Sequence, residues 1–400
     1  MSNVTFLNRL LDGAEVEWTT LGNENLVEVA NRGRKPVKAS LRAPGPTPYY
    51  GANNIQDYVE GHTHEGEYVL VAEDGSTSLE NYSIQYATGK FWANNHVHVL
   101  RGLASLNSRF LFHYLCIANF LPFLSGGGRA KLTKGRLVEI PIPIPCPSDS
   151  KKSLDIQGEI VRILDTFTEL TAELTAELTA RKKQYNYYRD QLLRFEDGDV
   201  EWTTLGDQDC FETGSGGTPS KSKPEYWDGG TIPWLKSESC NNRPVFSAKN
   251  FITDLGLKKS SAKLLEAETT LMALVGATIF KTAFIEFKAA TNQNIASIKS
   301  KRPDLINDKF VFYYLTNMYD VLKSTMSDYG MLNLTSLRQF KIPVPTPAEQ
   351  NRIVSILDKF DTLTNSISEG LPREIELRQK QYEYYRDLLL SFPKPEEVEA

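Results

Sequence analysis

The chain repeats itself over a long interval. Residues 15–22, which read Glu-Val-Glu-Trp-Thr-Thr-Leu-Gly, return almost unchanged at residues 199–206. Residues 160–165 return at 353–358, and residues 181–190 return at 378–387. A self-similar interval this long indicates two copies of a whole domain with its helix, not a solenoid of short repeats. Two copies in one chain form a pseudo-dimer, which suits the reading of two sites a fixed distance apart.

Two long segments are predicted to be helices that pair. From about Ser153 to Phe195 apolar residues recur at steps of three and four, with Thr-Ala-Glu-Leu repeated at 171–174 and 175–178. A single helix of roughly 60 Å needs a partner along its length. Residues 348–392 carry the same pattern, interrupted at 370–372, where Pro372 should kink the helix. We expect an antiparallel coiled coil, and the alternative is a packed helical hairpin without a special role.

The two remaining regions resemble each other weakly but in order. Residues 107–115 match 307–315 as a short amphipathic helix, and each region leaves through an Ile-Pro-x-Pro segment that should be extended. The fold class predicted is α+β, with two similar domains separated and joined by a pair of long antiparallel helices. The chain stops where a third Glu-Trp-Thr-Thr-Leu-Gly block would begin. We therefore expect a circular, pseudo-two-fold arrangement with neighbouring termini.

Composition excludes several classes of protein. The chain is 40% hydrophobic and 24% charged, which is ordinary for a globular protein. No apolar run approaches the ~20 residues that span a bilayer, and the N-terminus lacks a secretion signal. Four cysteines without a C-x-x-C pattern favour neither a disulfide framework nor a zinc knuckle. We predict a cytoplasmic protein with reduced thiols and no membrane contact.

Motifs for catalysis, metals and cofactors fail on inspection. Residues 214–221 contain glycines and a lysine but not the phosphate-loop pattern, and no Asn-Pro-Pro-aromatic motif occurs. Glu286 and Lys288 suggest half of a nuclease motif, but Asp304 lies after them rather than before. The histidine pairs at 62 and 64 and at 96 and 98 lack an accompanying ligand cluster. We therefore expect no catalytic residue, no metal site and no cofactor.

These motifs together resemble the specificity subunit of type I restriction–modification systems, in the subgroup with Thr-Ala-Glu-Leu repeats, over essentially all of the chain. The resemblance implies two target-recognition domains, each reading one half of a bipartite site in double-stranded DNA. It further implies that the long helices set the spacer and dock two methyltransferase subunits, and that motor-nuclease subunits join the complex. The domains would be residues 1–150 and 199–347, and the conserved helices would be 151–198 and 348–400.

Candidate DNA contacts lie on loops that combine amides, hydroxyls and cations. In the first domain they are Tyr50, Asn53, Asn54, Lys90, Asn94, Asn95, Arg129 and Lys131. In the second domain they are Gly216, Thr218, Ser220, Lys221, Lys236, Lys281, Asn292, Gln293, Ser327 and Tyr329. Candidate contacts to the methyltransferase subunits are Trp18, Trp202, Leu174, Leu178, Tyr188, Arg189, Tyr385 and Arg386.

Simpler interpretations stay open for single residues. Phe91, Trp92 and Trp234 are also suited to the core, and Asn53 and Asn94 to capping turns. Phe280 stands where the family usually has glycine, so the geometry of that turn is in question.

Two other classes of protein compete with a specificity subunit: a scaffold that does not read DNA, and an orphan DNA-binding regulator. The net charge of −5 argues mildly against a DNA binder that acts alone. A basic cleft, or partners with more positive surface, remain compatible with it.

Overall fold

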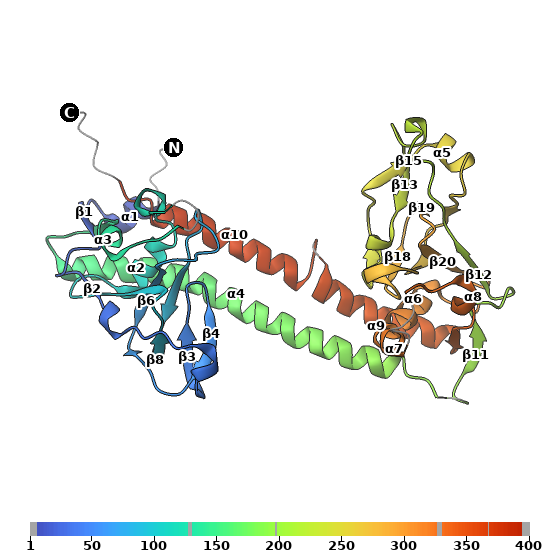
Figure 1. Ribbon diagram of the computed structural model, residues 1–400, viewed down its shortest axis with the longest axis horizontal. Coiled ribbons are helices and arrows are strands. Elements are labelled where there is room, and N and C mark those ends of the chain that lie inside the picture. Colours follow the sequence, from blue (N-terminus) through green and yellow to red (C-terminus); the bar gives the residue numbers. More distant parts are fainter. Residues whose placement is uncertain (1–5, 127–129, 197, 326–329, 367, 394–400) are drawn as a thin grey trace. The chain divides into compact units, whose positions relative to one another are not determined.

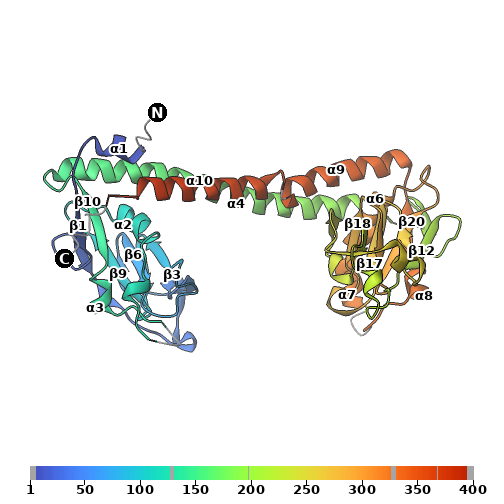
Figure 2. The same ribbon diagram turned by 90° about the horizontal axis from the view of Figure 1, so that it is seen from above.

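The computed structural model describes residues 6–126, 130–196, 198–325, 330–366 and 368–393. It contains two compact units (Figures 1 and 2). Unit 1 comprises Met1–Thr175 and Glu374–Ala400, and unit 2 comprises Ala176–Arg373. The C-terminal helix therefore belongs with the N-terminal domain, and the halves of the long helix α4 (Ser150–Leu192) belong to different units.

Unit 1 consists of a strand pair, two sheets and short helices. Strand β1 pairs antiparallel with β10, so that Trp18 lies opposite Pro143. A main sheet has the order β2-β9-β6-β7, and a small sheet has the order β4-β3-β8-β5. Helix α2 packs on the main sheet, whose central strand β6 is buried throughout. The bounds are α1 (Phe6–Leu11), β1 (Val16–Thr20), β2 (Val27–Val29), β3 (Pro44–Tyr50), β4 (Ile55–Val59), β5 (His64–Glu65), β6 (Tyr68–Ala72), β7 (Ile84–Ala87), β8 (Lys90–Ala93), β9 (Val97–Gly102), α2 (Ser108–Leu115), α3 (Lys134–Leu137) and β10 (Pro141–Pro145).

Unit 2 repeats this topology. Its strand pair is β11 and β21, its main sheet is β12-β20-β17-β18 extended by β14, and its small sheet is β15-β13-β19-β16. The mixed α and β architecture predicted from the sequence is confirmed. The bounds are β11 (Glu201–Thr204), β12 (Phe211–Ser215), β13 (Ile232–Leu235), β14 (Arg243–Val245), β15 (Asn250–Ile252), α5 (Asp254–Lys258), β16 (Leu264–Leu265), β17 (Thr269–Ala273), β18 (Thr282–Ile285), β19 (Ala289–Thr291), β20 (Ile295–Ser300), α6 (Asp308–Asn317), α7 (Tyr319–Thr325), α8 (Leu334–Leu337) and β21 (Lys341–Val344).

The second long helical segment is interrupted rather than kinked. Helix α9 (Pro347–Asn365) ends before Gly370, whose φ of 85° is left-handed, and α10 (Leu371–Leu389) starts anew. Pro372 lies in the first turn of α10, where its missing N–H has no helical partner to lose. The expected proline kink is therefore wrong in kind, because the proline begins a helix.

Within each unit the helices contact each other through aromatic rings. In unit 1 Phe167 of α4 stacks on Tyr385 of α10, with ring centroids 5.2 Å apart. In unit 2 Tyr188 of α4 stacks on Phe360 of α9 at 5.9 Å. These pairs stand at corresponding positions of the two sequence copies.

The C-terminal segment after α10 packs on the first domain. The indole N–H of Trp18 donates to the carbonyl oxygen of Pro393 at 2.7 Å, and Phe392 packs edge-on against Phe110. Unit 1 is therefore built from both ends of the described chain.

Corresponding side chains join each domain to its helices. In unit 1 Asp165 of α4 accepts from Arg109 and His113, both at 2.9 Å. In unit 2 Asp358 of α9 pairs with Lys309 at 3.0 Å and accepts from the Tyr313 hydroxyl at 2.5 Å. The similarity of residues 107–115 and 307–315 thus reflects a shared attachment to the long helices.

Two buried histidines in unit 1 give it an acid sensitivity that unit 2 lacks. Burial lowers the pKa of His113, although Asp165 opposes the shift, and burial likewise lowers the pKa of His98. An unfolded histidine has a pKa near 6.5, so between that value and the lower folded pKa the unfolded chain binds more protons. Protonation in this range therefore favours unfolding. All five histidines of the sequence lie in unit 1.

We predict that unit 1 loses stability relative to unit 2 as the pH falls from about 7.5 to about 5.5, by up to roughly 1 kcal/mol for each of His98 and His113. Hydrogen exchange followed by mass spectrometry, corrected for intrinsic rates, would report each unit separately. His113→Tyr, which copies Tyr313 of unit 2, should remove the contribution of His113. Equal loss of protection in both units would contradict the prediction.

Candidate nucleic-acid interface

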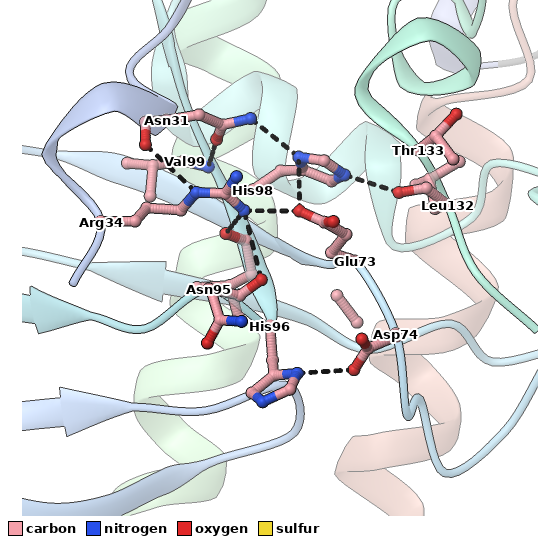
Figure 3. Close-up of polar contacts among 12 residues, drawn as sticks. Asn31, Arg34, Glu73, Asp74, Asn95, His96, His98, Val99, Leu132 and Thr133 are labelled. Atoms are coloured by element: carbon pink, nitrogen blue, oxygen red, sulfur yellow. Dashed lines mark hydrogen bonds and ion pairs between the residues drawn. The ribbon is translucent and has the colours of Figure 1, made fainter. Parts of the chain in front are cut away.

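A polar network underlies the predicted DNA-binding turn of unit 1 (Figure 3). Glu73, just after β6, accepts from Arg34 at 2.6 Å and pairs with Lys131 at 3.1 Å. Burial alone would raise the pKa of Glu73, but the hydrogen bonds from Arg34 and Lys131 outweigh it and lower the pKa. The carboxylate therefore stays ionised and ties two segments of the chain together.

His98 forms the buried side of this network. Its Nε2 lies 2.7 Å from the Leu132 carbonyl oxygen, and its Nδ1 lies 2.9 Å from the Asn31 amide nitrogen. With its pKa lowered by burial, the ring is neutral at pH 7, donates through Nε2 and accepts through Nδ1. This arrangement holds the segment before α3 against β9, as Figure 3 shows.

Two predicted contact residues hold turns instead of facing outward. Asn94 and Asn292 are 3% and 8% exposed, and their side-chain oxygens accept from the backbone N–H groups of His96 and Asn294. The backbone N–H groups of Asn94 and Asn292 themselves donate to the carbonyl oxygens of Tyr50 and Leu235 in the small sheets. The two asparagines are therefore structural equivalents, and the turn-capping interpretation of Asn94 holds in this conformation.

Some of the other candidate residues of unit 1 are held by hydrogen bonds or ring packing, and others are exposed. Asn53 is exposed, but its amide donates to Gly75 O at 2.9 Å and its oxygen accepts from Thr77 N. The Tyr50 ring is half-buried and packs edge-on against Phe91. Asn54, Lys90 and Asn95 are exposed, and Lys131 is exposed beside Glu73. Arg129 lies outside the described residues.

In unit 2 the backbone of the predicted loop before β13 lies very close to neighbouring strands. A side chain at Gly216 would place its Cβ 2.1 Å from Thr291 O, so this position requires glycine. Thr218 donates to Gln293 at 2.6 Å, and Ser220 bonds to Ser222 at 2.8 Å. Lys221 is exposed, while Lys236 and Lys281 are half-buried. Ser327 and Tyr329 lie outside the described residues.

The turn whose geometry was in question is formed without glycine. Phe280 has a φ of 67°, the left-handed region that glycine favours, and its side chain is 1% exposed. Its N–H donates to Ala273 O at 2.9 Å. Burial of a phenylalanine contributes about 1.5–3 kcal/mol, which offsets the roughly 1–2 kcal/mol cost of this backbone conformation.

Some of the predicted methyltransferase contacts are packed within their own domain, and others are exposed. Trp18 and Trp202 pack edge-on against Tyr114 and Tyr314 of their own domains, so both belong largely to domain packing. Leu174 and Leu178 are half-buried along α4, and Arg189 and Arg386 each pair with the following aspartate. Tyr188 and Tyr385 are 42% and 37% exposed.

Sequence reasoning missed a basic segment of unit 1. Residues 31–54 contain Arg32, Arg34, Lys35, Lys38 and Arg42 but no acidic residue. The acidic average of the whole chain hides this segment, and a count of charge in short windows would have found it.

The described part of the chain contains no group of three or more His, Cys, Asp or Glu side chains that could hold a metal ion. Among the same residues, no helix combines the length and apolarity needed to cross a membrane.

The turn asparagines give a matched test. Asn94→Ala should destabilise unit 1 by about 1 kcal/mol, because the half-buried N–H of His96 loses its acceptor. Asn95→Ala, one residue on and exposed, should leave stability unchanged. Hydrogen exchange in strands β8 and β9 would measure both, and equal effects would contradict the assignment.

Comparison with known proteins assigns the family. The model of the type I restriction modification DNA specificity domain matches residues 15–181 and 199–377. The chain is 46% identical to S.HindORF215P of Haemophilus influenzae, designated a type I restriction enzyme specificity subunit, over 98% of this chain and 99% of that protein. It is 40% identical to the EcoR124I/EcoR124II specificity subunit of Escherichia coli, over the full length of both.

A solved structure supports the fold independently. The S subunit of a type I restriction–modification system from M. genitalium superposes with a TM-score of 0.60 at 16% identity, over 96% of this chain and 98% of that one. The relatives and the family model together show that the chain belongs to the specificity subunits of type I restriction–modification systems.

Proposed function

We propose that the chain reads a bipartite site in double-stranded DNA, with each domain recognising one half. The observation that carries this proposal is a shared scaffold with different outward side chains. The small sheets of the two units have the same strand order, and the turns after β8 and β19 are held alike by Asn94 and Asn292. The exposed residues that follow them differ, being Asn95 in one turn and Gln293 in the other.

The long helices would set the spacing and dock two methyltransferase subunits, which methylate one adenine in each half-site, while motor-nuclease subunits restrict unmodified DNA. Exposed tyrosine pairs support two equivalent docking sites. Tyr187 and Tyr188 on α4 correspond in sequence to Tyr384 and Tyr385 on α10, and all four are at least 37% exposed. Equivalent surfaces on both copies suit two copies of one partner.

The competing classes are less well supported. A scaffold without DNA reading leaves the exposed cations Arg32, Lys35 and Lys38 unexplained, since no carboxylate among the described residues pairs with them. An orphan regulator leaves the exposed tyrosine pairs without a purpose.

Genome-wide methylation mapping by single-molecule sequencing tests the proposal. The host would express the chain with a compatible methyltransferase subunit. We expect a new split motif with adenine methylated in both halves. A soluble complex that gives no new motif would contradict DNA reading in this pairing.

Removing one repeat tests the spacing role. Deleting residues 175–178 shortens the helix by about 6 Å, close to two base-pair steps of 3.4 Å. The mapped motif should then keep both half-sites and shorten its unspecified spacer by up to about two base pairs. Duplication of the same four residues should lengthen it, and an unchanged spacer in both variants would refute the idea.

A further inference from the structure

A basic loop crosses the small sheet of unit 1. Residues 31–42, between β2 and β3, contain Arg32, Lys35, Lys38 and Arg42 in addition to Arg34. Arg34 is used in the network around Glu73, and Arg42 lies 3.5 Å from Asp57. The remaining three cations are exposed, and no carboxylate among the described residues pairs with them.

The backbone of this loop is held by aromatic side chains of the small sheet. The Trp92 indole donates to Lys35 O at 2.7 Å, and the Tyr49 hydroxyl accepts from Val37 N at 3.0 Å. Lys35 N donates to Ala93 O at 3.0 Å. Tyr49 and Trp92 come from neighbouring parallel strands and stack with ring centroids 6.3 Å apart.

Two cationic side chains of the loop also contact the aromatic rings and the loop backbone. The Arg42 guanidinium lies 4.1 Å from the centroid of Tyr49, and its Nε donates to Val37 O at 3.1 Å. The Lys35 ammonium lies 5.9 Å from the Trp92 ring. Such cation–π contacts hold a charge in place without neutralising it. The loop is thus a fixed frame that presents positive charge to solvent.

Unit 2 has a loop of the same construction before β13. The indole of Trp234, which matches Tyr49 in strand register, donates to Gly217 O at 3.1 Å. Trp227 donates to Ser220 O at 3.1 Å. The two tryptophans line a cavity of about 450 Å³ together with Lys221, Lys236, Asn250 and the carboxylate of Asp228. Neither lysine forms an ion pair with a carboxylate among the described residues.

We infer that these two loops are phosphate clamps, each holding the backbone of duplex DNA beside its half-site. The inference rests on the proposed function and names the surface that performs it. Phosphate contacts position a protein on the duplex without reading sequence, and they need fixed cations free of carboxylate partners. Both loops are tied to the small sheet through aromatic side chains, and the same sheet leads into the turns at Asn95 and Gln293.

The salt dependence of binding tests the clamp of unit 1. The full chain in complex with its methyltransferase subunits would be titrated with labelled duplexes, one with the mapped motif and one unrelated, at several salt concentrations. Lys35→Gln with Lys38→Gln should make the slope of log K against log salt less negative by about two. Binding to both duplexes should weaken by the same factor, because the contacts carry no sequence information.

Lys151→Gln with Lys152→Gln, at the first turn of α4, removes the same charge and is the matched control. It should leave the slope unchanged. Trp92→Phe keeps every charge and the ring but loses the bond to Lys35 O, and should weaken binding several-fold by loosening the loop.

The outcomes separate the two proposals. An unchanged slope in the Lys35 and Lys38 variant, or an equal change in the control, overturns the clamp. If the slope changes as expected but the wild-type complex does not prefer the mapped motif, the clamp stands and sequence reading by this complex fails. The same measurement on Lys221→Gln with Lys236→Gln tests unit 2.

Discussion

The attachment of each domain to its helices through one carboxylate is the contact on which the rest depends. Asp165 binds Arg109 and His113, and Asp358 binds Lys309 and Tyr313. A half-buried carboxylate without partners would be costly, so its partners fix the angle between domain helix and long helix within each unit. Helices α2 and α6 in turn pack on the main sheets, so this contact also ties each main sheet to a long helix.

The two copies keep the geometry of this contact while changing its chemistry. His113 and Arg109 donate to the carboxylate in unit 1, and Tyr313 and Lys309 do so in unit 2. Both pairs donate to a carboxylate oxygen of the long helix, which is the property that the attachment requires. The backbone amides of Asn107 and Asn307 likewise donate to Gln157 and Gln350, both at 2.8 Å. A scaffold maintained by such interchangeable donors leaves the outer loops free to differ.

The distribution of charge follows the same division of roles. The chain is acidic overall, yet residues 31–54 are wholly basic among their charged residues. Glu73 neutralises Arg34, whose role is to hold the turn, and the exposed cations beside it stay unpaired among the described residues. Net charge was therefore a poor guide to the partner of this surface, because the position of the charges matters more than their sum.

The two-copy organisation, the long helices, the interruption near Gly370 and the family could all be predicted from the amino-acid sequence. These properties are written in spacings along the chain, and the period of a helix or a repeat is local. Which loop residues face outward depends on how distant segments pack together. The parallel pairing of β3 with β8 brings Tyr49 beside Trp92 and sets the loop at Lys35 across both. Asn94 was predicted to contact DNA through its side-chain amide, but in the structure it is a buried turn cap. Burial depends on contacts between segments far apart in sequence, which no local pattern records.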